Sequence, residues 1–249
     1  MISIIIPCWN DADALRDCLA RIVPVAATHE VIVADASSTS DCAAIAASFP
    51  AVRVVGCDRP NRGRQMNCGA AAATGDVLLF QHTDTELNLA HLQAIERALS
   101  GDAQLVGGAF HRKFDPRHRS RQWLVPLVRR WQAWRRNFYG DQSIFVRRAH
   151  FQAMGGYAEI ALMEDIEFSA RLKRSGKVIV LDPPLLSSAR RHRRHGKLLV
   201  TFENFALIAL FKLGVSPDRL HRWYYRKARK LAHQGEASAI GAPQIAPEG

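Results

Sequence analysis

The sequence lacks several features that assign a chain to a common class at once. No run reaches 18 uncharged apolar residues, and the closest, 198–213, is interrupted by Glu203, Asn204 and Lys212, so we predict no transmembrane span. The first residues carry no basic region and too short an apolar stretch for a signal peptide. The five cysteines are odd in number and form no C-x-x-C pair. This argues against a zinc ribbon or a disulfide framework and favours reduced thiols in the cytoplasm.

Glycine-rich phosphate loops are also absent. The turn after the first apolar run reads Pro7-Cys8-Trp9-Asn10, without the glycines of a G-x-G-x-x-G fingerprint, and no G-x-x-x-x-G-K-[ST] segment occurs. A Rossmann dinucleotide site and a P-loop are therefore excluded. Any nucleotide must be held in another way.

What is present is an ordinary globular composition with unevenly distributed charge. In a chain of 249 residues, 48% are apolar and 23% charged, which excludes wholesale disorder. The net charge is +11, but residues 1–111 carry 7 basic and 12 acidic groups, whereas residues 112–249 carry 27 and 11. An acidic first half is a poor clamp for nucleic acid, and the basic second half suits an anionic surface or substrate.

The first hundred residues alternate short apolar runs with helical patterns. Strands are predicted at 2–6, 30–34, 52–56, 76–80 and 105–110. Helices are predicted at 11–22, 40–49, 63–74 and 89–99. This alternation predicts an α/β fold with a doubly wound parallel sheet. Ligands of such sheets bind beyond the carboxyl ends of the strands.

Acidic residues occur at four informative positions. Asp35 ends the second predicted strand and either binds a base or ribose or caps the next helix. Asp84 follows the fourth strand and either holds a divalent cation on a diphosphate or is a turn residue. Asp141 precedes another apolar run, and Glu164-Asp165 open a predicted helix. Acids at a helix start either complement the helix dipole or serve as a general base beside an acceptor.

In their order along the chain, these motifs resemble the family 2 inverting glycosyltransferases, which have the GT-A fold. The matching segments within residues 2–182 are SIIIPCWND (3–11), VIVADASSTSD (31–41), RGRQMNCGAAAATGDVLLFQHTDT (62–85), GDQSIFVRR (140–148) and MEDIEFSARLKRSGK (163–177). The chain is similar to a small bacterial subgroup associated with arsenosugar biosynthesis. The resemblance implies a GT-A-type doubly wound mixed sheet flanked by helices, with a basic helical C-terminal region.

The same resemblance implies a domain organisation. We expect a single domain over residues 1–233, with a nucleotide-sugar-binding half at 1–111 and an acceptor half at 112–233 that carries basic amphipathic helices. Residues 234–249 are rich in Gly, Ala, Pro and Ser and are predicted to form a flexible tail.

The implied activity is a hexosyltransferase-like, inverting transfer of a sugar from a UDP- or GDP-sugar to an acceptor hydroxyl. Asp165 corresponds to the catalytic base of the family, with Glu164 beside it. Asp84 corresponds to the last aspartate of the family's DxD motif and would bind Mn²⁺ or Mg²⁺. The implied donor-binding residues are Pro7, Asn10, Asp35, Arg62, Arg64, Asn67, His82, Thr83 and Asp84. The implied acceptor-binding residues are Asp141 and Gln142.

One position departs from the family pattern. His82 stands where the first aspartate of DxD is expected, so metal binding would depend on Asp84. His82 either contacts a phosphate or the sugar, or faces solvent at the end of a strand. Two alternatives therefore stay open: a degenerate, non-catalytic sugar-nucleotide binder and a nucleotidyltransferase. The latter usually carries a glycine-rich basic loop after the first strand, which this chain lacks.

The second half of the chain contains an aromatic and basic stripe. Between residues 112 and 136, nine Arg or Lys accompany one Asp, and the aromatic residues Trp123, Trp131, Trp134 and Phe138 share one helical face. The stripe either packs on the core or a second subunit of a homodimer, or lies in an anionic membrane interface near a lipid-linked acceptor. Nucleic acid is disfavoured because the catalytic half is acidic. We predict a cytoplasmic protein that binds the inner face of a membrane peripherally through residues 119–139.

Overall fold

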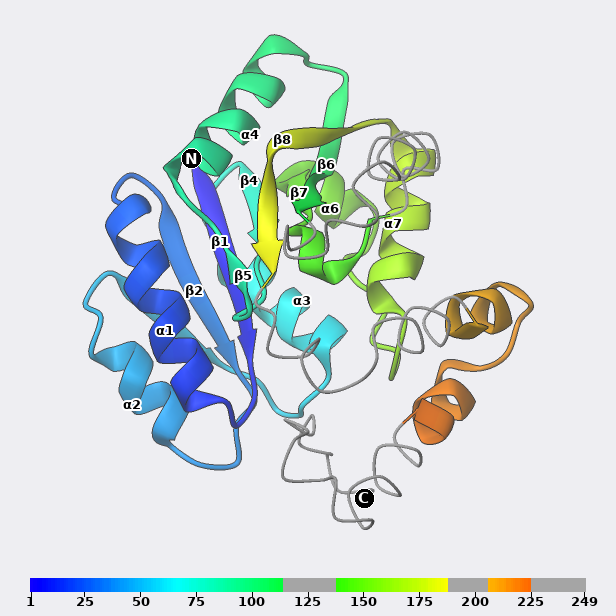
Figure 1. The fold of residues 1–249 in the computed structure, drawn as a ribbon, viewed down its shortest axis with the longest axis horizontal. Helices are drawn as coiled ribbons and strands as arrows, with labels where there is room; N and C mark the ends of the chain where they lie inside the picture. Colours follow the sequence, from blue (N-terminus) through cyan, green and yellow to red (C-terminus); the bar gives the residue numbers. More distant parts are fainter. Residues whose placement is uncertain (114–137, 188–205, 225–249) are drawn as a thin grey trace, which may run out of the picture.

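The computed structural model describes residues 1–113, 138–187 and 206–224 (Figure 1). Within these residues, eight strands form one sheet in the order β3-β2-β1-β4-β7-β6-β8-β5. The strands are β1 (Ile2–Cys8), β2 (Glu30–Asp35), β3 (Val52–Gly56), β4 (Val77–Phe80), β5 (Thr85–Glu86), β6 (Leu105–Lys113), β7 (Phe145–Arg147) and β8 (Lys177–Ser187). The α-helices are α1 (Ala12–Ile22), α2 (Asp41–Ala47), α3 (Arg62–Ala72), α4 (Leu89–Gly101), α6 (Arg148–Ala153) and α7 (Glu164–Ser175), and two short 3-10 helices are η1 (Val23–Val25) and η3 (Gly140–Gln142).

The first half of the sheet is parallel and the second half is mixed. β1 pairs in parallel with β2 and β4, and β2 pairs in parallel with β3, so the carboxyl ends of these strands meet at one edge. β7 runs antiparallel between β4 and β6, and β5 runs antiparallel to β8. The parallel arrangement predicted from the alternation is confirmed for β1 to β4. The mixed sheet implied by the resemblance is also confirmed.

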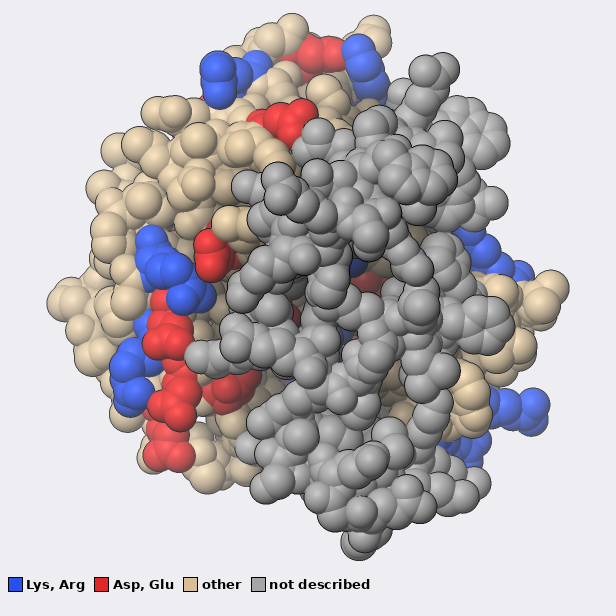
Figure 2. Space-filling model, in the orientation of Figure 1, with Lys and Arg blue, Asp and Glu red and all other residues tan. Residues whose placement is uncertain are grey.

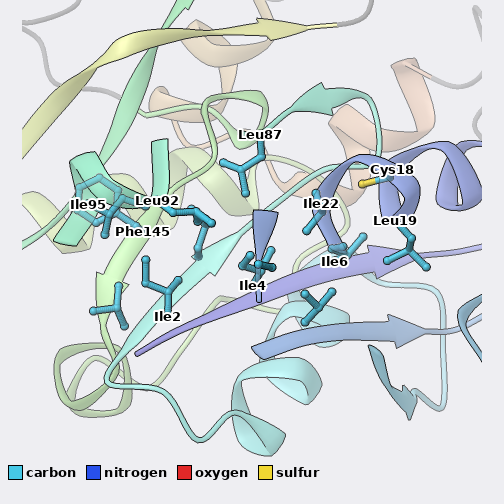
Figure 3. Close-up of a cluster of buried hydrophobic side chains, with 14 of the residues drawn as sticks. Ile2, Ile4, Ile6, Cys18, Leu19, Ile22, Leu87, Leu92, Ile95 and Phe145 are labelled. Atoms are coloured by element: carbon cyan, nitrogen blue, oxygen red, sulfur yellow. The ribbon is translucent and has the colours of Figure 1, made fainter. Parts of the chain in front are cut away.

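The central position of β1 follows from its apolar side chains on both faces, as expected for a parallel strand that is covered on each side. Ile4 and Ile6 lie in one buried cluster with Leu19 of α1 and residues of α4 (Figure 3), and residues of α2 complete this cluster. Ile5 points to the other face, where it joins Met66 of α3 and residues of α6 and α7. Helices therefore cover both faces, which leaves the strand ends as the accessible edge.

The predicted elements of the first hundred residues are confirmed to within a few residues, and β3 matches at both ends. The alternative that Asp35 caps α2 is wrong, because Ser40 stands at the N-cap of that helix. β5, α6 and β8 have no counterpart among the predicted elements. β8 contains Pro183 and Pro184, which are typical of turns, but β5 pairs only with the last two residues of β8. The prolines are tolerated because the β5 side is unpaired there and the pairing of β8 with β6 is interrupted between Leu181 and Leu185.

The aromatic and basic stripe lies outside the described residues except for Arg112 and Lys113 at its start and Phe138 at its end. Phe138 is fully buried in the core, and its backbone N–H donates to Ser169 Oγ at 2.8 Å. This end of the stripe therefore packs inside the chain. The predicted tail at 234–249 also lies outside the described residues.

Residues 206–212 and 217–224 form two short helices, drawn in orange in Figure 1. Leu207 and Leu220 are buried, and the same segment exposes several other apolar side chains. No helix among the described residues is long and apolar enough to cross a membrane. On the opposite side of the molecule, over α1 and α2, acidic and basic side chains are interspersed (Figure 2).

Candidate active site

Two adjacent carboxylates open α7 at the edge of the sheet. Asp165 accepts a hydrogen bond from the Gly140 N–H to Oδ2 at 2.7 Å and one from the Ile166 N–H to Oδ1 at 2.7 Å. Burial, and then the neighbouring charge of Glu164, raise the pKa of Asp165 to about 7, although the Gly140 N–H and Arg62 pull it down. Asp165 is thus a fixed carboxylate that exchanges its proton near neutral pH.

Glu164 is held from the opposite side by α3. It is 3% exposed, and its Oε1 accepts a hydrogen bond from Nη1 of Arg62 at 3.0 Å. Arg62 is the first residue of α3, and 102 positions separate the two partners in the chain. The guanidinium satisfies a carboxylate that would otherwise be buried without a counter-charge.

These two carboxylates line a small pocket. Its lining residues are Met66, Phe80, His82, Gly140, Ile144, Tyr157, Glu164 and Asp165. A Cβ at Gly140 would lie 2.6 Å from Nε2 of His82, so the absence of a side chain at position 140 lets the histidine approach the η3 turn. Burial, and then the charges of Asp165 and Glu164, raise the pKa of Tyr157 well above its usual value. The phenol therefore remains protonated. The structure brings His82 and the carboxylate pair into one site.

The loops after β1 and β2 are bound to each other at the same edge of the sheet. The Asn10 N–H donates to Ser37 Oγ at 2.8 Å, and Asn10 Oδ1 accepts the Ser38 N–H at 3.0 Å. Asn10 has φ 47°, a left-handed conformation that asparagine tolerates. Asp35 Oδ1 accepts the Ser37 N–H at 2.9 Å and is half-buried. Pro7 lies at the same end of β1, so three of the predicted donor-binding residues are neighbours.

The predicted donor-binding residues on α3 point to the loop before α7. Arg64 forms ion pairs with Asp58 at 2.9 Å and Glu159 at 3.4 Å, and these carboxylates raise the pKa of its guanidinium further above the usual range. Asn67 Nδ2 donates to the Tyr157 carbonyl at 2.9 Å, and its Oδ1 accepts the Tyr157 N–H at 2.8 Å. Asn67 therefore supports Tyr157 in the wall of the pocket, whereas Arg64 ties the segment before α7 to the loop after β3.

The segment after β4 is fixed by Gln81, which sequence reasoning missed. Its Oε1 accepts the Ser143 hydroxyl at 2.6 Å and its Nε2 donates to the Thr85 carbonyl at 2.7 Å. Gln81 is fully buried, so these bonds hold the turn that carries Thr83 and Asp84 next to η3. The sequence feature that could have identified Gln81 is a polar residue directly after the four-residue apolar run 77–80.

The two predicted acceptor residues lie on η3 and have partners within the chain. Asp141 Oδ2 pairs with Nη2 of Arg112 at 2.7 Å. Gln142 is 2% exposed, and its Nε2 donates to the Phe110 carbonyl at 2.9 Å while its Oε1 accepts the Tyr139 N–H at 2.9 Å. Gln142 thus shapes the turn that presents Gly140 to Asp165.

Asp84 suits a hard divalent cation as a single carboxylate ligand. Asp84 is a half-buried carboxylate at the carboxyl end of β4, and Thr85 Oγ1 lies 3.4 Å from its Oδ1. It does not belong to the cluster of three metal-ligand side chains found among the described residues, which is Cys8, Asp35 and Cys42. A single carboxylate fits Mg²⁺ or Mn²⁺ when substrate phosphates and water supply the other ligands.

The mixed sheet and its flanking helices match the GT-A fold of nucleotide-sugar-dependent glycosyltransferases. The family model described as Glycosyl transferase family 2 matches residues 3–155. The chain therefore belongs to glycosyl transferase family 2. The match ends before Glu164-Asp165 and does not cover that pair.

Two mycobacterial proteins are similar to this chain in sequence. An uncharacterized protein of Mycobacterium tuberculosis is 27% identical over 221 residues, covering 77% of this chain and 67% of that protein. An uncharacterized glycosyltransferase of Mycobacterium bovis is 31% identical over 107 residues, covering 43% of this chain and 47% of that protein. The match with this second relative therefore spans about half of that protein's length.

Solved structures of glycosyltransferases share the fold. A mannosyltransferase from Pyrobaculum calidifontis in complex with GDP-Man and Mn²⁺ superposes with a TM-score of 0.64 at 15% identity, covering 97% of this chain and 72% of that one. S. aureus TarS residues 1–349 with UDP gives 0.60 at 14% identity, covering 95% and 74%. Glucosyl-3-phosphoglycerate synthase from M. tuberculosis with Mn²⁺, UDP and phosphoglyceric acid gives 0.59 at 18% identity, covering 86% and 79%. At identities of 14–18%, these similarities show a shared fold.

Proposed function

We propose that the chain transfers a glycosyl group from a nucleoside-diphosphate sugar to an acceptor hydroxyl with inversion at the anomeric carbon, and that Asp165 is the general base. The observation that carries this proposal is the half-buried Asp165 carboxylate, fixed by two backbone N–H groups and lining a small pocket. A base whose pKa lies near 7 is matched to proton transfer at physiological pH.

The proposed reaction is a single displacement. The acceptor oxygen attacks the anomeric carbon while its proton passes to Asp165, and the bond to the nucleoside diphosphate breaks on the opposite face. Glu164 is bound to Arg62 and keeps the negative potential around Asp165 high, which favours uptake of the proton. His82 and Tyr157 also line the pocket, and we assign them to the sugar or its leaving phosphate.

The donor is proposed to lie across the ends of β1, β2 and β4. Asp35 and Asn10 are close enough to share the Ser37 loop, and we assign them to the base and ribose. Related folds have been solved with GDP-Man, UDP and UDP-GlcNAc, which supports a UDP- or GDP-sugar as the donor class. We assign the acceptor to the side of η3, near Asp141.

Asp84 is proposed to hold Mn²⁺ or Mg²⁺ together with the donor diphosphate. Such an ion neutralises the charge that develops on the leaving group, which is often a large part of the acceleration. Folds of this kind have been solved with Mn²⁺, in agreement with this assignment. Asp84→Ala should therefore remove the Mn²⁺ dependence of nucleoside-diphosphate binding.

Asp165→Asn tests the proposed function directly. The variant should bind donor nucleotide with Mn²⁺ as the wild type does in calorimetry, and should lose transfer by roughly 10²–10⁴-fold, the usual contribution of a general base. Asp13→Asn is the matched control, because Asp13 also lies in the first turn of a helix but is exposed. Wild-type turnover in Asp165→Asn would exclude the base. Nucleotide binding without any transfer in the wild type would favour the non-catalytic alternative.

We further propose that the chain binds an anionic membrane surface peripherally, on the cytoplasmic side, as a route to a lipid-linked acceptor. The supporting observation lies in residues 206–224, where Leu213 is 81% and Trp223 48% exposed beside basic residues such as Arg222. An aromatic and aliphatic surface flanked by positive charge suits the lipid interface.

A further inference from the structure

A second side-chain cluster shares Asp35 with the proposed donor site and adds two cysteines that the transfer chemistry does not use. Cys8 ends β1, Asp35 ends β2 and is its register partner, and Cys42 lies in the first turn of α2. One ligand atom from each of the three side chains lies within 4.8 Å of the other two. The two sulfurs are 3.2 Å apart, and both cysteines are free thiols.

The surroundings give this cluster both rigidity and an entrance. Cys8 is 3% exposed and Cys42 fully buried, while Asp35 is half-buried. Gln65 Nε2 donates to the carbonyls of Cys8 at 2.6 Å and Ala34 at 3.1 Å, which fixes the ends of both strands. A surface pocket opens beside Cys42, with lining residues Asn10, Ala12, Thr39, Asp41 and Cys42. Of the three cluster residues Cys42 lines this pocket, which would be the route of a small cation to the sulfurs.

The donor atoms differ in kind from those at Asp84. Two thiolates and one carboxylate suit a borderline-soft cation such as Zn²⁺, whereas Mn²⁺ and Mg²⁺ prefer oxygen. Sulfurs bound to one tetrahedral zinc at ~2.3 Å lie about 3.8 Å apart, so the thiols must separate by roughly 0.6 Å. The fourth position of such a site would be open to water.

We propose that Cys8, Asp35 and Cys42 form a binding site for a thiolate-preferring divalent cation of the Zn²⁺ class, and that its occupation opposes nucleotide binding. The opposition to nucleotide binding rests on the proposed function. The cation must bind a carboxylate oxygen of Asp35, the residue assigned to the base and ribose, and Asp35 also holds the Ser37 N–H. Binding releases the two thiol protons to solvent, because only thiolates bind the cation. Cation affinity should therefore rise with pH.

The first experiment uses Cd²⁺ as a spectroscopic probe and Zn²⁺ as the competitor. With the full chain, Cd²⁺ should give a thiolate-to-metal charge-transfer absorption that saturates at one equivalent and is displaced by Zn²⁺. Cys42→Ser should lower the affinity by more than about tenfold, because even second-layer changes around metal ligands have effects of about 10- to 100-fold. Cys18→Ser is the matched control, since Cys18 is also buried but lies outside the cluster.

A second variant guards against a folding defect in Cys42→Ser. Asp35→Asn keeps both thiols and should retain the absorption while binding Cd²⁺ more weakly. An absorption that is unchanged in Cys42→Ser, or equally lost in Cys18→Ser, would overturn the site. Binding of Zn²⁺ without any thiolate absorption from Cd²⁺ would also overturn it.

The nucleotide arm separates this inference from the proposed function. UDP and GDP are titrated with Mn²⁺ present, before and after one equivalent of Zn²⁺, and Zn²⁺ should weaken nucleotide binding in the wild type but not in Cys42→Ser. Unchanged nucleotide affinity with Zn²⁺ bound would overturn the opposition and leave the cation site intact. A chain that binds neither nucleotide but gives the Cd²⁺ absorption would contradict the proposed function alone.

Discussion

Asp165 shows how one residue acquires a chemical role from its position. Both of its oxygens accept backbone N–H bonds, which fixes the carboxylate, and Glu164 beside it is neutralised only in part by Arg62. Desolvation and the adjacent charge favour the protonated form, while the N–H donors favour the ionised form. The balance lies near neutral pH, where a carboxylate of ordinary pKa would be a weak base.

The pH dependence of transfer follows from this balance. Because only ionised Asp165 accepts a proton, kcat/KM should fall about tenfold for each pH unit below about 7 and level off above it. The apparent pKa belongs to Asp165 coupled to Glu164. Initial rates with saturating Mn²⁺ between pH 5 and 9 measure it. A profile that is flat down to pH 5 would contradict the assignment.

The same titration predicts how stability changes with pH. The folded-state pKa of Asp165 is above the ordinary value, so between about pH 4 and pH 7 the folded protein holds a proton that the unfolded chain releases. Its contribution to stability is complete at low pH and is lost as pH rises to 7. We expect the free energy of unfolding of the wild type to decrease over this range relative to Asp165→Asn. Urea unfolding at several pH values measures the difference, and an opposite trend would refute the raised pKa.

Arg62 provides a prediction about the buried ion pair. Arg62→Ala leaves Glu164 buried without its partner and should lower the free energy of unfolding by about 1–3 kcal/mol, less than for a fully buried pair because Arg62 is 43% exposed. Arg59→Ala, which breaks the more exposed pair with Glu159, should cost less than about 1 kcal/mol. Equal effects in urea unfolding would show that the Glu164 pair has no special role.

At the scale of elements, α3 connects the two parts of the site. Its first residue binds Glu164, while Gln65 one turn later reaches the carbonyls at the ends of β1 and β2. Asn61 caps the helix through the Arg64 N–H at 2.9 Å and donates to the Ile160 carbonyl at 3.1 Å. The position of α3 therefore sets the distance between the donor edge and the carboxylate pair.

Close packing of α3 on β1 depends on a glycine. A Cβ at Gly69 would lie 2.4 Å from Cγ2 of Ile5, which is fully buried. Gly69→Ala should therefore destabilise the protein by about 1–3 kcal/mol through overpacking, despite the better helix propensity of alanine. Gly101→Ala at the end of α4 is the control, because nothing lies within 4 Å of its Cβ. A stabilised Gly69→Ala in thermal unfolding would contradict the close approach.

The sequence specified elements whose signal is local. The isoleucines of β1 and the apolar spacing of α1 predicted those elements almost to the residue. The spacing of apolar residues along the sequence indicates which faces of a strand or helix are buried. It did not specify pairs such as Arg62–Glu164, because no local rule links residues 102 positions apart. Asp165 was identified through the resemblance, but its two N–H donors depend on how η3 meets α7.

At the scale of the whole molecule, the two halves of the chain differ in charge, as the sequence predicted, but many of the basic residues lie outside the described ranges. The described end of the aromatic and basic stripe, Phe138, is core. The predicted membrane contact at 119–139 lies almost wholly outside the described residues and stays a prediction, and the helices at 206–224 offer a second candidate surface. There, exposed apolar residues alternate with Lys212, Arg219 and Arg222.

The last prediction is that the chain binds anionic vesicles through this surface. Each basic residue near the lipid contributes about 1 kcal/mol, screened over a Debye length of ~8 Å, so flotation with anionic vesicles should weaken as salt rises. Trp223→Ala and Leu213→Ser should each reduce flotation, because both side chains are exposed and apolar. Leu89→Ser is the control, since Leu89 is 49% exposed at the start of α4. If Trp131→Ala alone abolishes flotation, the contact lies in the stripe at 119–139. Absence of flotation at low salt, with a stable dimer in light scattering, would assign the apolar surface to self-association.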